Sequence, residues 1–383
     1  MKIPFNKPYL TGKEAHYLYQ AVLSGKISGN GMFTQKCHRF FEERYGFKKT
    51  LLTTSCTDAL EMAAILVGIE PGDEVIIPAY TFTSTANAFI LRGAKIVFAD
   101  SEAVSPNIDP EKIESLITPR TKAIVPVHYA GVACHMDKIM EIAGKHDLFV
   151  VEDAAQAVDS FYIRTASAPS ERPLGSIGHL GAFSFHETKN VICGEGGMLA
   201  INDEKLIARA EILWEKGTNR AAFFRGEVDK YSWMDIGSSY LPSDILAAFL
   251  YAQLENLDRI QEQRKKIWRR YYEELKDLED KELLKLPYIH EYACNNAHLF
   301  YILCRSETEW GEMLAHLKKC GITAIFHYLP LHKSGYYKEK HDGRDLPRCE
   351  YFSSHLIRLP MYYEISPQEI SYVCDRIKEF FGK

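Results

Sequence analysis

The sequence predicts an α/β protein: a large domain with a mostly parallel sheet between helices, followed by a smaller C-terminal α+β domain. From about residue 50 to 200, short apolar runs alternate with segments of helical length. Runs that are apolar on both faces and separated by helices are typical of a parallel sheet covered on both sides. A long charged amphipathic stretch, from about 246 to 286, then leads into a region that mixes strand-like and helical segments.

The expected strands of the large domain end in polar residues. The runs are EVIIPA (74–79), AKIVFAD (94–100), KAIVPVHYA (122–130), LFVVED (148–153), HLGAFSF (179–185) and GMLAIN (197–202). Helical segments such as TDALEMAAILVGI (57–69) and MDKIMEIAGKHD (136–147) lie between them. Ligands of such sheets bind beyond the carboxyl ends of the strands. The residues that follow each run are therefore the candidates for a site.

The expected boundary divides the chain into residues 1–250 and 251–383, with one long linking helix from about 246 to 286. In the second part, HLFYILC (298–304) and ITAIFHY (322–328) resemble strands. The basic run RKKIWRRYY (264–272) is best interpreted as the charged face of this helix, with Trp268 and Tyr271 packed inward. The polar segment RTASAPSERPLGS (164–176) predicts a surface loop.

Composition excludes several classes of function. Among 383 residues, 46 Lys and Arg stand against 51 Asp and Glu, a net charge of −5. This balance lacks the basic excess that nucleic-acid binding requires. The longest uncharged stretch, Val75 to Leu91, is broken by Pro78 and does not indicate a membrane span. The nine scattered cysteines form no C-x-x-C pair, so no metal site or disulfide framework is expected. With no apolar leader, we expect a cytoplasmic protein.

Three strand ends carry side chains that could take part in catalysis or ligand binding. LFVVED ends at Asp153, HLGAFSF is followed by Lys189, and LLTTSCTDAL (51–60) places hydroxyls before a helix. Each alone has an ordinary explanation, as a turn residue, a surface lysine or a helix cap. Together they provide what pyridoxal phosphate needs, namely a lysine for a Schiff base and a carboxylate for the ring nitrogen. The helix start at Ser55, Cys56 and Thr57 suits its phosphate.

An aromatic side chain should cover the cofactor ring. Phe82, in IIPAYTFTS (76–84), follows a strand end and is the first candidate, with Tyr80 as the alternative. Core packing is the competing explanation for both residues.

The motifs TTSCTDAL, IIPAYTFTSTANA, VPVHYAG, VVEDAAQA, FSFHETKN and GEGG, in this order, resemble the DegT/StrS-type sugar aminotransferases of fold type I. The resemblance extends from IPFNKP (3–8) to RLPMYY (358–363). IVPVHYAGVAC, SFHETKN, EKGTNR, FFRG, VDKY and DIGSSYL are most similar to the dTDP-4-amino-4,6-dideoxygalactose transaminases within that family. A deoxygenating dehydratase of the same fold typically replaces the lysine by histidine, which Lys189 argues against. A non-catalytic sensor would need an appended DNA-binding domain, for which we expect no room.

The resemblance implies a role for each candidate. Lys189 would carry the cofactor and then move protons, Asp153 would pair with the pyridinium nitrogen, and Gln156 would contact the ring or its 3-hydroxyl. Ser184 would join Ser55, Cys56 and Thr57 at the phosphate, and Phe82 would stack on the ring. The segment IFHYLPLH would face the substrate with His327, Tyr328 and His332. For the last three a packed strand and turn is the alternative.

The resemblance also implies a reaction. The amino group of L-glutamate would pass to C4 of dTDP-4-keto-6-deoxy-D-glucose, giving dTDP-4-amino-4,6-dideoxy-D-galactose and 2-oxoglutarate, for enterobacterial common antigen or another surface polysaccharide. Another nucleotide-linked keto sugar, either a 3-keto sugar or a UDP-linked 4-keto sugar, is the alternative. A homodimer with shared active sites is expected. Many relatives have Asn and Arg in the stretch matching GSSYLP (237–242), where this chain has Ser239 and Leu241.

Overall fold

The computed structural model describes residues 1–164 and 170–382. Its central element is a seven-stranded sheet in the order β1-β9-β8-β5-β4-β2-β3. The strands are β1 (Lys49–Thr53), β2 (Glu74–Pro78), β3 (Lys95–Ala99), β4 (Thr121–Ile124), β5 (Phe149–Asp153), β8 (Leu180–Ser184) and β9 (Gly197–Ile201). Neighbours from β3 to β8 pair in parallel, whereas β9 runs antiparallel to both β8 and β1. The mostly parallel sheet expected from the sequence is confirmed.

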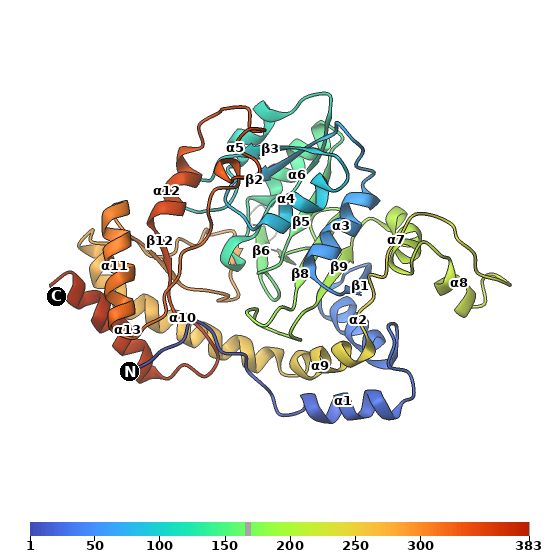
Figure 1. Cartoon of the computed structure of the whole chain (residues 1–383), viewed down its shortest axis with the longest axis horizontal. Helices are drawn as coiled ribbons and strands as arrows, with labels where there is room; N and C mark the ends of the chain where they lie inside the picture. The colour runs from blue at the N-terminus through green and yellow to red at the C-terminus, as the bar shows by residue number, and fades with distance from the viewer. Residues whose placement is uncertain (165–169, 383) are drawn as a thin grey trace.

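The sheet is covered by helices (Figure 1). Strands β2, β8 and β9 are buried along their whole length, which is why their sequences are apolar at successive positions rather than at alternate ones. The helices of this part are α1 (Glu14–Leu23), α2 (Met32–Tyr45), α3 (Cys56–Leu66), α4 (Thr83–Ile90), α5 (Pro110–Ile113), α6 (Met136–Lys145), α7 (Ile207–Trp214), α8 (Arg220–Phe224) and α9 (Asp244–Leu254).

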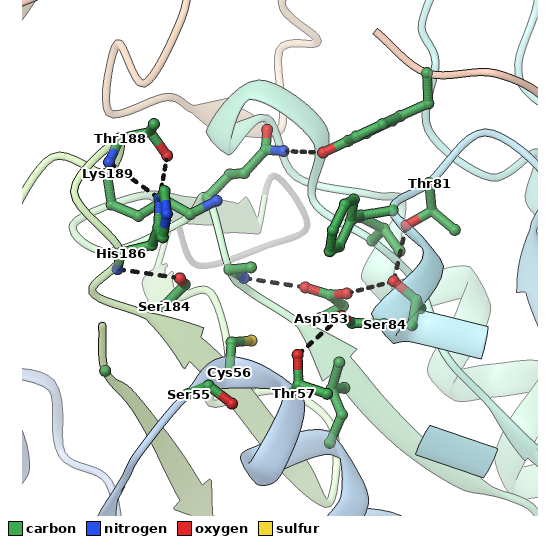
Figure 2. Close-up of a pocket in the computed structure, with 18 of the residues that line it drawn as sticks. Ser55, Cys56, Thr57, Thr81, Ser84, Asp153, Ser184, His186, Thr188 and Lys189 are labelled. Carbon is green, nitrogen blue, oxygen red and sulfur yellow. Dashed lines mark hydrogen bonds between the residues drawn. The ribbon is translucent and has the colours of Figure 1, made fainter. Parts of the chain in front are cut away.

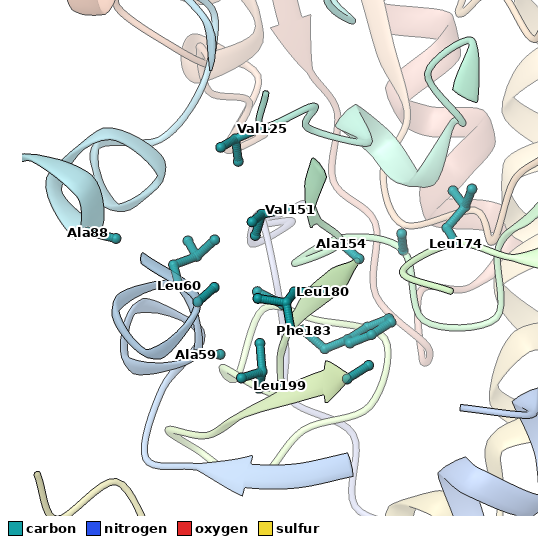
Figure 3. Packing of buried hydrophobic residues seen from close by; sticks show 14 of the residues in the cluster. Ala59, Leu60, Ala88, Val125, Val151, Ala154, Leu174, Leu180, Phe183 and Leu199 are labelled. Carbon is teal, nitrogen blue, oxygen red and sulfur yellow. The ribbon is translucent and has the colours of Figure 1, made fainter. Parts of the chain in front are cut away.

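Helix α3 packs its apolar side on the sheet. Ala59 and Leu60 of α3 meet Leu180 of β8 and Leu199 of β9, with Val151 of β5 beside them (Figure 3). All five side chains are at most 1% exposed. Burying apolar area at about 25 cal/mol per Å² makes such contacts the main stabilising term. The packing holds the first turn of α3 at the carboxyl ends of the central strands.

The C-terminal part forms around a second hydrophobic cluster. Helix α10 (Leu257–Asp280) contributes Ile267, Tyr271, Leu275 and Leu278 to this cluster, as the helical spacing predicts. Its other elements are β11 (Tyr301–Leu303), α11 (Glu307–Lys319), α12 (Pro347–His355), β12 (Leu356–Arg358) and α13 (Pro367–Phe380). Figure 1 shows α11, α12 and α13 gathered at one end of α10, near both chain termini.

The expected single helix from 246 to 286 is wrong in detail. The structure has two helices, α9 and α10, and α10 ends at Asp280. The boundary at residue 250 remains a prediction. Side chains from beyond it, such as Leu331 and Phe352, join the first cluster, while Ile3 joins the second.

Three further expectations differ from the structure. The run 322–328 is not a strand, because Ile322 and Ile325 each form only an isolated bridge, to Ile3 and Arg358. Of the run 122–130, only the residues up to Ile124 belong to β4, and the chain forms a helical turn at Tyr129–Gly131. In the expected loop 164–176, Ser170–Pro173 is strand β7, which pairs with β6 (Phe161–Arg164), itself paired with β10 (Ala293–Cys294). Residues 165–169 of that loop lie outside the described residues.

Two searches of the described ranges bear on function. None of the helices there is both long and apolar enough to cross a membrane. No group of three or more His, Cys, Asp or Glu side chains in the same ranges could hold a metal ion.

Candidate active site

A cavity of about 280 Å³ lies at the carboxyl ends of the central strands, where the sheet was expected to bind its ligand. Ten of the twelve candidates named from the sequence line it: Ser55, Cys56, Thr57, Phe82, Asp153, Gln156, Ser184, Lys189, His327 and Tyr328. Figure 2 shows the start of α3, the end of β5 and the loop after β8 contributing to its walls.

Lys189 lies in the loop that joins β8 to β9. Its backbone N–H donates to the carbonyl of His186 at 2.9 Å, which closes a tight turn. Burial lowers the pKa of the Lys189 amine to about 8. No carboxylate of the described residues lies within 4.0 Å of this amine. A buried amine that is partly neutral near pH 8 is a competent nucleophile toward an aldehyde.

Asp153 is the last residue of β5 and is 5% exposed. The Thr85 hydroxyl donates to its Oδ2 at 2.7 Å, and the Ala155 N–H donates to its Oδ1 at 3.1 Å. Burial nevertheless raises the pKa of this carboxyl, because the two donors do not fully replace water. The carboxylate is therefore oriented but not neutralised, which suits pairing with a cationic ring nitrogen.

The start of α3 forms a cradle for an anion. Ser55 caps the helix, and its hydroxyl accepts from the Asp58 N–H at 3.1 Å. The first N–H groups of a helix have no partner within it and favour a phosphate. Gly197 of β9 packs so closely here that an added Cβ would lie 2.3 Å from the Ser55 carbonyl carbon. This contact accounts for a glycine in the GEGG segment.

Gln156 connects the cavity to the C-terminal part of the chain. Its Oε1 accepts from the Ala130 N–H at 2.7 Å, and its Nε2 donates to the Tyr328 hydroxyl at 3.1 Å. Beside it, His327 Nδ1 lies 3.3 Å from the Tyr129 hydroxyl. Phe82, at the start of α4, is 57% exposed, so its ring is available to cover a ligand.

The structure does not bring Tyr80 and His332 to the cavity. Tyr80 is 1% exposed, and its ring packs edge-on against Tyr129 and Tyr328, which separate it from the ligand space. His332 is 4% exposed, and its Nε2 lies 3.2 Å from a carboxylate oxygen of Glu350. The packing alternative therefore describes both residues.

Several cavity residues were not among the twelve site candidates named from the sequence. Thr85, which orients Asp153, and Ser84, which lies 2.8 Å from the Thr57 hydroxyl, come from the start of α4. The hydroxyl-rich string TFTSTANA was a usable signal for both. His186 and Thr188 also line the cavity, and their side chains lie 2.9 Å apart.

A buried hydrogen-bonded pair of a carboxylate and an imidazole lies beside Asp153. Glu152 and His128 are both 0% exposed, and the Glu152 carboxylate lies 2.9 Å from His128 Nε2. Because His128 Nδ1 accepts from the Cys134 N–H at 3.2 Å, Nε2 carries the proton and donates to Glu152. The same carboxylate accepts from the N–H groups of Gly175, Ile177 and Gly178 at 2.6–2.8 Å. Glu152 thus fastens two loops to the strand that ends in Asp153.

Replacing Glu152 by glutamine is expected to lower the free energy of unfolding by about 3 kcal/mol, because an amide cannot accept from all four donors. Burial alone would raise the pKa of Glu152, but the hydrogen bonds from His128 and the backbone outweigh it and lower the pKa in the folded protein. Its stabilisation is complete above the unfolded-chain value of about 4.3 and is lost as pH falls through the lower folded value. Urea unfolding at pH 7 and pH 3 measures both effects.

The difference between wild type and Glu152→Gln should therefore shrink at pH 3. Glu262→Gln is the matched control, since among the described residues that carboxylate forms its one ion pair with Lys266, on the surface of α10. It should leave stability unchanged. An unchanged midpoint for Glu152→Gln at pH 7 would contradict this role.

The fold and the cavity define an enzyme that binds pyridoxal 5′-phosphate and transfers amino groups. The lysine, the carboxylate and the anion cradle fit the aldehyde, ring nitrogen and phosphate of this cofactor. The sequence matches the DegT/DnrJ/EryC1/StrS aminotransferase family over residues 8–378. The chain therefore belongs to this family and is a sugar aminotransferase, as expected from its motifs.

Known proteins support this assignment along the whole chain. The spore coat polysaccharide biosynthesis protein SpsC of Bacillus subtilis is 35% identical over 98% of this chain and 96% of its own. Among solved structures, S. venezuelae DesV is 29% identical with a TM-score of 0.89, covering 100% of this chain and 99% of its own. A Streptococcus pneumoniae protein assigned as a sugar aminotransferase, solved in its PLP form, is 27% identical with a TM-score of 0.88, covering 99% and 98%.

The cofactor, when bound, withdraws electrons from the carbon that carries the substrate amine. The chain's own residues supply the rest. Asp153, oriented by Thr85, would hold the proton on the ring nitrogen. Ser55, Thr57 and Ser184 would hold the phosphate. Lys189 would hold the aldehyde and, once released as a free amine, carry a proton between substrate and cofactor.

Proposed function

We propose that the protein transfers the amino group of L-glutamate to C4 of dTDP-4-keto-6-deoxy-D-glucose, giving dTDP-4-amino-4,6-dideoxy-D-galactose and 2-oxoglutarate. The observation that carries an amino transfer is the placement of Lys189 and Asp153 in one cavity with the anion cradle at Ser55. The choice of sugar rests on the similarity of VPVHYAGVAC, SFHETKN and DIGSSYL to that group of transaminases.

A role in making a surface polysaccharide is part of this proposal. The name of SpsC supports polysaccharide biosynthesis as the general context. Enterobacterial common antigen is the specific expectation that follows from the sugar. The cytoplasmic location expected from the sequence stays a prediction.

We also propose a homodimer whose active sites are shared between the two chains. Phe224, Tyr231, Trp233 and Met234 are between 53% and 82% exposed in the single chain. Helix α8 and the chain after it extend away from the rest of the molecule (Figure 1). Exposed apolar side chains gathered on one projecting segment are typical of an interface with another protein chain.

The two half-reactions test the proposed substrates separately. The absorption band of the bound cofactor should bleach when L-glutamate is added and return when dTDP-4-keto-6-deoxy-D-glucose follows. NMR of the product should then show an axial amine at C4. If the band bleaches but returns only with a 3-keto or a UDP-linked 4-keto sugar, the proposed sugar is wrong while the amino transfer stands. A band that glutamate does not bleach rejects glutamate as donor.

A further inference from the structure

Asn190, the residue after Lys189, is the centre of a buried hydrogen-bond network. It is 7% exposed. Its Nδ2 donates to the side-chain oxygen of Gln261 at 2.8 Å and to the carbonyl of Asn296 at 2.9 Å, while its Oδ1 lies 2.9 Å from His298 Nδ1. Gln261 belongs to α10, and the other two partners lie between β10 and β11. The loop that carries Lys189 is thus fastened to the C-terminal part of the chain at the residue next to the lysine.

The network also fixes the proton on His298. Because Asn190 Nδ2 faces two oxygen atoms, the amide is oriented with Oδ1 toward the imidazole, and His298 Nδ1 donates to it. Burial, and after it the positive charge of Lys189, lowers the pKa of His298 well below its usual value. The ring is therefore neutral, with its one proton at Nδ1. His298 holds Asn190 without placing a second positive charge beside Lys189.

The segment 296–298 has an uncommon backbone conformation. Ala297 is 1% exposed and has a φ of 52°, in the left-handed region that residues with a Cβ rarely adopt. Arg264 of α10 holds this conformation by donating to the carbonyls of Ala297 and His298. Strained residues of this kind persist where their surroundings hold them, and they gather at functional sites. Here the conformation brings the carbonyl of Asn296 and the ring of His298 to one side chain, that of Asn190.

Asn296 also supports Gln156, which lines the cavity. Its Nδ2 donates to the backbone carbonyls of Gln156 and Val158, at 2.8 and 2.7 Å. An added Cβ on Gly131 would lie 2.1 Å from Asn296 Oδ1, so the backbone there packs directly on this amide. The residue before that glycine, Ala130, supplies the N–H that Gln156 Oε1 accepts. The segment 296–298 therefore holds two separate walls of the cavity.

We propose that Asn190 and His298 are positioning residues that hold the Lys189 amine in place for proton transfer, with the segment 296–298 setting their geometry. This inference rests on the proposed function, in which an amino acid is the donor. In that reaction the Lys189 amine takes the proton from the carbon that bears the donor nitrogen and returns a proton later. Neither Asn190 nor His298 gains or loses one. A misplacement of about 1 Å can lower such a rate on the order of 100-fold.

Substitutions in the network separate the position of Lys189 from its presence. His298→Leu removes the donor to Asn190. It should slow the bleaching of the cofactor band by L-glutamate about 10- to 100-fold, while the glutamate concentration that gives half the maximal rate stays within about twofold. His298→Asn places an amide nitrogen near the position of Nδ1 and should recover most of the rate. Asn190→Leu combined with His298→Leu should be no slower than Asn190→Leu alone, because both changes break the same contact.

An isotope effect identifies the step that is slowed. With glutamate deuterated at the α-carbon, the isotope effect on bleaching should be larger in His298→Leu than in wild type, because removal of that proton then limits the rate. A change that only loosens the fold has no reason to slow this step selectively.

A further readout needs neither cofactor nor donor. Competitive acetylation from about pH 6 to pH 10, followed by mass spectrometry, gives the pH at which Lys189 becomes reactive. In wild type this midpoint should lie near the pKa of about 8 that burial gives Lys189. In His298→Leu it should rise, because a loosened lysine reaches water, which favours its ammonium form. His332→Leu is the matched control: His332 is also 4% exposed, but it pairs with Glu350 away from the cavity, so its loss should change neither the midpoint nor the isotope effect.

The outcomes distinguish this inference from the proposed function. A rate, isotope effect and Lys189 midpoint in His298→Leu that equal those of wild type overturn the inference. Equal changes in His298→Leu and His332→Leu, or no recovery in His298→Asn, leave His298 a structural role only and overturn it too. If glutamate does not bleach wild type, the proposed donor is wrong, and the acetylation midpoint by itself then supports or overturns the positioning of Lys189.

Discussion

Lys189→Ala is expected to abolish amino transfer, lowering the rate by at least about 10³-fold, because the side chain is both the attachment point of the cofactor and the proton carrier. Since burial lowers the pKa of this amine to about 8, attachment in wild type should become more complete as pH rises through that value. Single-turnover absorbance measurements with L-glutamate measure the rate. Absorbance of the bound cofactor between pH 6.5 and 9.5 measures attachment.

Two comparisons make the Lys189 result specific. Lys205→Ala removes an exposed lysine after β9 and should behave as wild type in both assays. A small primary amine such as methylamine, added to Lys189→Ala, should restore part of the proton transfer, because it replaces the missing base. Turnover at the wild-type rate in Lys189→Ala would reject the assigned role.

Asp153→Asn should lower the rate of the glutamate half-reaction by on the order of 10²–10³-fold, because a neutral amide no longer stabilises the charged ring nitrogen. The change should leave the cofactor-free protein no less stable. Burial raises the pKa of Asp153, so its charged form is less favourable in the cofactor-free protein than in water. Without cofactor, the Tm of Asp153→Asn should be no lower than that of wild type. Adding the cofactor should raise the Tm of the variant less than it raises the Tm of wild type.

Thr85→Val is a milder variant that tests the orientation of the Asp153 carboxylate without removing it. It removes only the 2.7 Å hydrogen bond to Oδ2, so it should cost about tenfold in the same half-reaction. A large fall in the Tm of cofactor-free Asp153→Asn would show a structural role instead. A normal rate in that variant would remove Asp153 from the site.

The sequence was most informative where one strand or one turn decides the geometry. The parallel sheet follows from runs apolar at every position, and Asp153, Lys189, Phe82 and the residues that start α3 follow from what stands after those runs. The other cavity residues were named from the resemblance to the family, namely Gln156, Ser184, His327 and Tyr328. The strand expected at 322–328 was wrong, because this run forms only isolated bridges. An apolar run has the same sequence pattern whether one residue or five residues of it pair with a neighbouring strand. Tyr80 and His332 stand next to site segments, but their side chains turn into the core.

Glu152 illustrates the other limit of sequence interpretation. In LFVVED it is one acidic residue beside Asp153 and has no distinguishing pattern. Its partners are His128 and the N–H groups of Gly175, Ile177 and Gly178, all of which lie more than twenty residues away in the sequence.

The reversed strand β9 has a consequence for how the protein folds. Its pairing with β1 joins Lys49 to Ile201 and Thr53 to Gly197, the most sequence-distant contact in the central sheet. Pairings between distant residues form slowly, because a long loop must close before they contribute. Strand β9 also pairs with β8, which joins Gly197 to Ser184 at the two ends of the Lys189 loop, and Gly197 packs against the start of α3. A chain that ends before β9 is therefore expected not to retain the cofactor, because the Lys189 loop and the start of α3 are not yet held together.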